Sequence, residues 1–198
     1  MAAARPDGGA SAIDIASLDS CAAAAFAVAV APLFEGAPRF LGRLAAARPF
    51  GSIDELFARA RTIAQAMPRD EQLELIDAHP RLGAPQETVS AMSFREQGYD
   101  RAARATDAAD AADERARIAA ELDRLNAAYE TRFGFRYCVF VAGRPREALL
   151  PGMAAALDAD PEAELRRALD AVVDIAADRY AMLQHGSATL GGDRERAR

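Results

Sequence analysis

Apolar residues recur at intervals of three and four along most of the chain, which is the spacing of helices that turn one face toward a core. The clearest stripe predicts a long helix over about residues 107–133, and another predicts a helix over about 161–184. The first stripe consists of Ile118, Leu122, Leu125, Tyr129 and Phe133. The second consists of Leu165, Leu169, Val172, Ala176, Tyr180 and Leu183. Both helices are expected to bury these faces.

Helix start and stop signals divide the rest of the chain into shorter helices. Ser52 followed by Glu55 is a capping box, and Pro68 suits the first turn of a helix. Pro80 disfavours helix at the residue before it. Together these signals predict helices over about 19–34, 38–48, 53–67, 68–79, 93–97 and 146–157.

An apolar run over 135–141 follows Gly134, which ends the preceding helix. The run is long enough for a short strand but has no partner strand, so we expect an extended buried segment. The predicted fold class is therefore all-α, a single irregular multi-helix domain over residues 12–187. Residues 1–11 and 188–198 have no periodic apolar pattern and are expected to be disordered tails.

Charge and apolar content exclude several kinds of partner. The formal net charge of -6 argues against a nucleic-acid surface. The longest apolar run, 21–34, is shorter than the roughly 20 residues that span a membrane. Asp14 and Asp19 precede it, where a signal peptide has positive charge. We therefore expect no nucleic-acid partner, no membrane partner and no secretion.

The two cysteines, Cys21 and Cys138, lie far apart in apolar surroundings and lack the spacing of a metal site. They are interpreted as reduced core thiols, with a catalytic cysteine as a minor alternative. The chain ends in Arg196-Ala197-Arg198 rather than in a peroxisomal Ser-Lys-Leu signal. These observations predict a cytoplasmic protein.

Only two histidines are candidates for proton transfer near neutral pH. His185 falls at the predicted end of the last helix and is expected at the surface. His79 ends a helix and precedes a turn that contains Pro80 and Gly83, which is a usual place for a functional side chain. The alternative is that His79 only caps the helix through its dipole, and periodicity alone favours that interpretation.

Two further positions carry polar groups that suit a ligand. Ser93 and Glu96 form a second capping box, which is the default interpretation. Alternatively, Glu96 and Gln97 project toward a ligand, and Glu96 orients an imidazole. Arg179 follows the stripe position Ala176 by three and is placed at the edge of the buried face.

Several familiar chemistries have no motif in this chain. It lacks the HExxH metalloprotease pattern, GxGxxG, the P-loop and the GxSxG elbow. No His-rich or Cys-rich cluster indicates a zinc site. We therefore expect an acid–base reaction with no metal and no cofactor.

Taken in order along the chain, short motifs resemble the family of 2-oxo-4-hydroxy-4-carboxy-5-ureidoimidazoline (OHCU) decarboxylases. The resemblance covers about residues 17–184, nearly the whole predicted domain. The motifs are Leu33-Phe34-Glu35, Ala47-Arg48-Pro49-Phe50, His79-Pro80-Arg81-Leu82-Gly83, Ser93-x-x-Glu96-Gln97, Leu125-Asn126-x-x-Tyr129-x-x-Arg132-Phe133-Gly134-Phe135, Asp160-Pro161-x-x-Glu164-Leu165 and Ile175-x-x-x-Arg179.

This resemblance implies an all-α, cofactor-free, homodimeric enzyme that makes (S)-allantoin from OHCU late in the urate pathway. It implies that His79 is the acid–base residue and that Glu96 is catalytic with it. Pro80, Ser93 and Gln97 are then expected to bind the ureidoimidazoline substrate, and Arg179 to pair with a substrate oxygen or carboxylate. The backbone of the segment Tyr137, Cys138, Val139, Phe140 and Val141 is expected to contact the substrate ring.

The sequence departs from the family pattern at several places and leaves two alternatives open. It has no tryptophan, and Ala37-Pro38-Arg39, Gly98-Tyr99-Asp100 and Arg136-Tyr137-Cys138 differ from the usual residues. These changes are compatible with a paralogue that acts on a related ureido acid. A non-catalytic helical binding module is the other alternative. The presence of His79, Glu96 and Gln97 argues against it, because a scaffold does not need all three.

Overall fold

The structure is a computed structural model that describes residues 14–97 and 109–195. These residues form helices joined by loops and contain no strand, which confirms the all-α fold class. The elements are α1 (Ile15–Ser20), α2 (Ala23–Val30), η1 (Ala31–Phe34), α3 (Pro38–Ala46), α4 (Ile53–Ala66), α5 (Arg69–Asp77), η2 (Gln86–Thr88), α6 (Ala91–Glu96), α8 (Ala109–Phe133), η3 (Arg146–Leu149), α9 (Leu150–Ala156) and α10 (Pro161–Glu195). The predicted tail over 1–11 and the predicted helix start near residue 107 lie outside the described residues.

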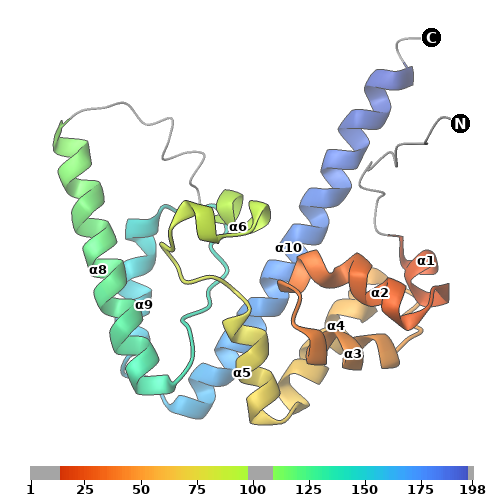
Figure 1. Cartoon of the computed structure of the whole chain (residues 1–198), viewed down its shortest axis with the longest axis horizontal. Helices are drawn as coiled ribbons and strands as arrows, with labels where there is room; N and C mark the ends of the chain where they lie inside the picture. Colours follow the sequence, from red (N-terminus) through yellow and green to blue (C-terminus); the bar gives the residue numbers. More distant parts are fainter. Residues whose placement is uncertain (1–13, 98–108, 196–198) are drawn as a thin grey trace, which may run out of the picture.

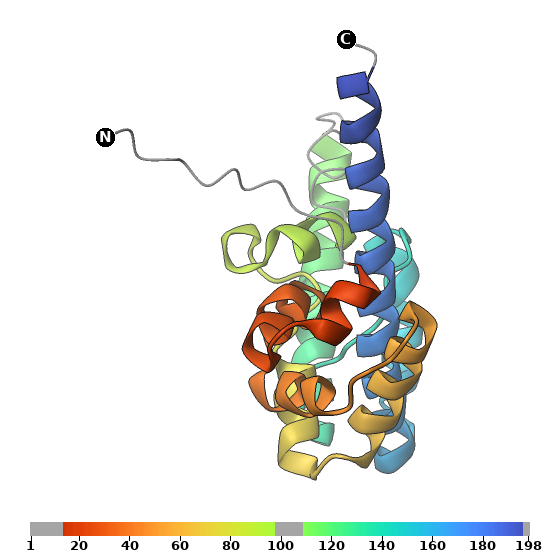
Figure 2. The same cartoon turned by 90° about the vertical axis from the view of Figure 1, so that its right-hand side faces the viewer.

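The long helix α10 is the axis around which the other helices are arranged (Figure 1). Helices α1 to α4 lie on one side of it, and α8 with α9 on the other. α10 packs against α4, α5 and η1, while α8 packs against α9. Figure 2 shows that the C-terminal part of α10 extends beyond the other helices.

The predicted apolar stripes form the core where the two longest helices face it. Four of the five positions on α8 are buried, and Ile118 packs against the core from a partly buried position. On α10, the first four positions of the stripe are buried, and Tyr180 and Leu183 are partly buried. The three-and-four spacing therefore identified the inward faces of both helices correctly.

The predicted helix over 19–34 is wrong as one element, because the structure breaks it into α1, α2 and η1. The first break falls at Cys21, whose backbone is extended. Arg48, from a distant loop, donates through Nη1 to the carbonyl oxygens of Leu18 and Cys21 at 2.9 and 2.6 Å. This long-range contact occupies carbonyls that a continuous helix would use, and apolar spacing gives no sign of it.

The last helix is longer than predicted. α10 reaches Glu195 instead of ending near Gln184, so the predicted end of this helix is wrong. Glycine costs a helix roughly 1 kcal/mol relative to alanine but does not block it as proline does, and no proline follows Pro161. The division of the chain into one domain over 12–187 stays a prediction.

Asp19, two residues before the break at Cys21, also binds the loop that follows Arg48, and this contact can be tested. Its carboxylate accepts hydrogen bonds from the backbone N–H groups of Phe50 and Gly51 at 2.9 and 2.8 Å. Asp19→Ala should lower the free energy of unfolding by about 1–3 kcal/mol, because both donors lose their acceptor. Chemical denaturation alongside Asp158→Ala, at an exposed position, measures the difference. Equal stabilities of the two variants would contradict this role.

Candidate active site

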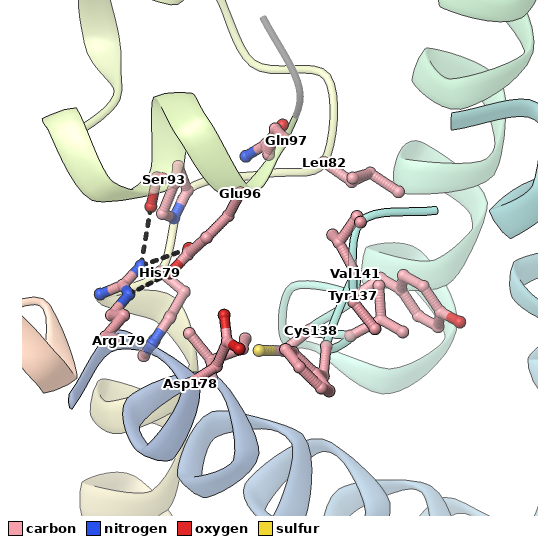
Figure 3. A pocket seen from close by; sticks show the side chains of 16 residues that line it. His79, Leu82, Ser93, Glu96, Gln97, Tyr137, Cys138, Val141, Asp178 and Arg179 are labelled. Carbon is pink, nitrogen blue, oxygen red and sulfur yellow. Dashed lines mark hydrogen bonds and ion pairs between the residues drawn. The ribbon is translucent and has the colours of Figure 1, made fainter. Parts of the chain in front are cut away.

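A pocket lies where the end of α5, α6, the segment 137–143 and α10 meet (Figure 3). It brings together all the residues to which the sequence assigned a role, although they are far apart in the chain. They are His79, Pro80, Ser93, Glu96, Gln97, Tyr137, Cys138, Val139, Phe140, Val141 and Arg179. The remaining lining residues, to which the sequence reasoning assigned no role, are Leu82, Ala142, Gly143, Ile175 and Asp178.

The turn that follows His79 is held by side chains from other elements. The Gln97 amide accepts from the N–H of Gly83 at 2.8 Å and donates to the carbonyl of Arg81 at 3.2 Å. Asn126 of α8 donates to the carbonyl of Leu82 at 3.0 Å. Gly83 has a φ of +83°, a conformation that glycine adopts without strain. Gln97 therefore fixes the turn beside the pocket, and its contact with a ligand stays a prediction.

His79 is both tied to its helix and turned toward the pocket. Its side chain is buried, and Nδ1 lies 3.2 Å from the carbonyl oxygen of Leu75. Because a carbonyl oxygen only accepts, Nδ1 carries the proton of the neutral ring and Nε2 keeps a lone pair. Nε2 is buried without a hydrogen-bond partner in the described part of the chain. The neutral ring is thus bound to the end of its helix by a hydrogen bond rather than by a charge at the helix dipole, and Nε2 is left for another role.

Burial and a neighbouring positive charge keep the His79 ring neutral. Loss of hydration, followed by repulsion from Arg179, lowers the pKa of His79 from 6.5 to about 4. Attraction by Glu35 acts in the opposite direction but is weaker. At neutral pH the ring is therefore ready to accept a proton before it donates one.

Arg179 is fully buried, not at the edge of the α10 stripe as predicted. Nε and Nη2 bind the two oxygens of Glu96 at 2.5 and 2.8 Å (Figure 3). Nη2 also contacts Glu35 at 2.8 Å and the Ser93 hydroxyl at 3.0 Å. Nη1 donates to two carbonyl oxygens of η1 at 3.0 and 3.3 Å. Burial alone would lower the pKa of Arg179, but the carboxylates outweigh it and raise that pKa, so the group stays charged.

Ser93 does not cap α6, so the capping-box interpretation is wrong. The N-cap is Ser90, whose hydroxyl accepts from the Ser93 N–H at 3.1 Å. Ser90 lies three residues earlier and starts the helix first, which leaves the Ser93 side chain inside the first turn. There it is buried, and its hydroxyl donates to Glu35 at 2.7 Å. Ser93 is therefore part of the polar cluster at the pocket.

Glu35 is the member of this cluster to which the sequence reasoning gave no role, although it lies in the motif Leu33-Phe34-Glu35. One oxygen accepts from Ser90 Oγ at 2.8 Å, Ser93 Oγ at 2.7 Å and Arg179 Nη2 at 2.8 Å. Burial alone would raise the pKa of Glu35, but these hydrogen bonds and the charge of Arg179 lower it. The available signal was an acidic residue directly after the apolar run 21–34.

Glu96 pairs with Arg179, and the expected alignment of the His79 ring by Glu96 is not found. Both carboxylate oxygens of Glu96 are bound to the guanidinium, while the His79 ring is held by Leu75. A guanidinium offers two parallel charged donors, which bind a carboxylate more strongly than a neutral imidazole does. The structure thus separates two groups that the sequence reasoning had paired.

The opposite wall of the pocket is the segment 137–141, which has no partner strand in the described residues. The Tyr137 ring packs against Tyr129 with centroids 5.0 Å apart, and its hydroxyl points away from the pocket (Figure 3). Burial raises the pKa of Cys138 to about 12, so its thiol stays protonated and is a poor nucleophile at neutral pH. Both cysteines are free; Cys138 is buried in the core, whereas Cys21 is only partly buried.

No group of three or more His, Cys, Asp or Glu side chains that could hold a metal ion occurs within residues 14–97 and 109–195. In the same described ranges, no helix is long and apolar enough to cross a membrane.

Comparison with known proteins gives consistent matches. The family model described as OHCU decarboxylase matches residues 19–181. The chain is 32% identical over 157 residues to a 2-oxo-4-hydroxy-4-carboxy-5-ureidoimidazoline decarboxylase of Haloferax volcanii, covering 79% of this chain and 87% of that protein. It is 33% identical over 149 residues to the uric acid degradation bifunctional protein PucL of Bacillus subtilis, covering 75% of this chain but only 28% of PucL. A crystal structure of (S)-allantoin synthase shares the fold, with a TM-score of 0.59 and 21% identity over 86% of this chain and 54% of that one.

The neutrality of His79 can be tested by NMR. We expect its ring to remain neutral down to about pH 5 and to titrate near pH 4, because burial and Arg179 disfavour the cation. The unfolded chain binds this proton near pH 6.5, so His79 should make the fold less stable as the pH falls from 6.5 toward 4. A ring ¹H–¹⁵N titration of the wild type and of His79→Gln assigns the two histidine signals. Titration of His79 at pH 6.5 or above would contradict the expectation.

Proposed function

Because this chain belongs to the OHCU decarboxylase family, we propose that it converts OHCU to (S)-allantoin in the degradation of urate. The observation that carries the proposal is the pocket in which His79, Ser93, Glu96 and Arg179 meet, although three separate parts of the chain supply them. The names of the matched relatives support the substrate, the product and the pathway.

The reaction makes demands that this pocket can meet. Loss of carbon dioxide leaves an electron pair that the adjoining carbonyl system of the substrate can delocalise. The enzyme then has to orient the scissile carboxylate, stabilise the developing negative oxygen and deliver a proton to one face.

His79 is proposed to move the proton. In its neutral form the ring has a lone pair on Nε2, so it first accepts a proton from the substrate. The resulting imidazolium then returns a proton to the carbon that has lost carbon dioxide. Because Nδ1 is fixed by Leu75, Nε2 reaches only one face of the substrate, and this would determine the (S) configuration.

Arg179 and Glu96 are proposed to act as a unit. Arg179 already binds Glu35, Glu96, Ser93 and two carbonyls, so a substrate oxygen reaches it only by replacing one of these acceptors. We therefore assign to Arg179 first the positioning of Glu96 and Ser93, with direct substrate contact as its predicted second role. Glu96 would then accept hydrogen bonds from N–H or O–H groups of the substrate.

The remaining contacts are proposed for the ring and the ureido group. Pro80 and Gln97 would contact the substrate from the side of His79, and the backbone of 137–141 from the opposite wall. We further propose that the enzyme is a cytoplasmic homodimer, as the family resemblance implies.

Activity assays test the assignments of His79 and Glu96. His79→Ala and Glu96→Gln should lower kcat by about 100- to 10,000-fold, the usual contribution of positioned acid–base groups. OHCU would be generated from urate by urate oxidase and the following hydrolase, and (S)-allantoin followed by circular dichroism. His185→Ala and Glu87→Gln are matched controls, since both residues are exposed, and should retain wild-type rates.

Each result of this assay has a distinct meaning. Well-folded wild-type protein that does not exceed the spontaneous rate would overturn the proposed substrate and favour the paralogue that acts on a related ureido acid. A fully active His79→Ala variant would overturn the role of His79 alone.

The predicted homodimer should have a molar mass of twice 21.1 kDa in light scattering coupled to size exclusion. Measurement over a hundredfold range of concentration distinguishes a stable dimer from transient association. A mass of one chain at all concentrations would contradict the prediction.

A further inference from the structure

The segment 137–141, which forms one wall of the pocket, separates the pocket from a second, outer groove. Val139 and Phe140 line the pocket on one side and also line an open groove on the other side, between α4 and α10. Arg144, Arg166 and Arg167 line this outer groove but not the pocket. Since the wall has no neighbouring strand in the described residues, other groups have to fix its backbone.

Two arginines bind the wall from the side of the outer groove. Arg167 donates through Nη1 to the carbonyl oxygen of Cys138 at 2.9 Å. Arg144 donates to the carbonyls of Phe140 and Val141 at 2.5 and 3.0 Å. These bonds replace the ladder bonds that a strand would receive from a sheet.

Arg167 is itself held rigidly. Its Nε and Nη2 bind Glu164 at 2.9 and 2.7 Å, and its guanidinium lies 4.9 Å from the centroid of the Tyr137 ring. Glu164 is buried and accepts a further hydrogen bond from the Tyr129 hydroxyl at 2.6 Å. Burial, followed by the contact with Glu164, raises the pKa of Tyr129, so its hydroxyl stays a donor. The core of α8 and α10 is thus connected to the carbonyl of Cys138 through one side chain.

We propose that Arg167 is a positioning residue of the enzyme: it binds the Cys138 carbonyl from outside the pocket and so fixes the wall against which the substrate ring lies. This proposal rests on the proposed function, because it concerns the same pocket. Arg167 does not line the pocket, and it acts on the ring only through residues 138–140. Loss of the Arg167 side chain should therefore weaken substrate binding more than it slows proton transfer by His79, because His79 lies on the opposite side of the pocket.

The test compares three variants in the coupled assay. Arg167→Met should raise KM at least tenfold while kcat falls less than threefold and the pH profile of kcat keeps its shape. Arg166→Met, the matched control at the exposed neighbouring position, should keep the wild-type KM. Asp19→Ala, which removes hydrogen bonds to Phe50 and Gly51 away from the pocket, should lower the melting temperature without changing KM.

The outcomes distinguish a loss of positioning from a general loss of stability, and both from failure of the proposed function. Unchanged KM in folded Arg167→Met would overturn the proposal, and so would an equal rise of KM in Asp19→Ala, which would indicate only loss of stability. Wild-type protein inactive on OHCU would overturn the proposed function and, with it, the substrate role of the wall. Independently of activity, the backbone amide signals of residues 138–140 should shift in Arg167→Met and not in Arg166→Met. Unshifted signals would contradict the positioning itself.

Discussion

The buried ion cluster around Arg179 is the constraint on which the rest of the pocket depends. A guanidinium without exposed surface costs several kcal/mol unless its N–H groups find acceptors, and here η1, Glu35 and α6 supply them. One side chain of α10 therefore joins the N-terminal helices and α6 to the central helix. Separating any of these elements would remove acceptors from a buried guanidinium, which favours their observed relative positions.

The same cluster sets the state of His79. The charge of Arg179 adds to the effect of burial, so the ring stays neutral, while the carbonyl of Leu75 fixes its tautomer. Because Glu96 is bound by Arg179, the acid–base group and the carboxylate are oriented independently. The histidine is thus held by its own helix and the carboxylate by α10. A change in one does not require a change in the other.

The opposite side of the pocket is organised differently. A lone segment of backbone cannot satisfy its polar groups as a strand in a sheet does, and arginine side chains take over this task from outside. The turn after His79 follows the same principle, since the amides of Gln97 and Asn126 bind its backbone. Long polar side chains therefore do in this all-α protein what ladder hydrogen bonds do in a β structure.

The sequence by itself determined the helical class and the inward faces of α8 and α10, which follow from apolar periodicity between residues close in sequence. The set of residues around the pocket was indicated by short motifs that resemble a known family. Only the tertiary structure decided the break at Cys21, the burial of Arg179, the place of Ser93 within α6 and the part played by Glu35. The break at Cys21, the burial of Arg179 and the contacts of Glu35 depend on partners at least about 27 residues away. The place of Ser93 depends on competition between Ser90 and Ser93 for the N-cap of α6. Apolar periodicity carries no information about long-range partners or about this competition. The candidate site residues could thus be predicted from motifs, whereas their pairing was set by which charges the fold buries together.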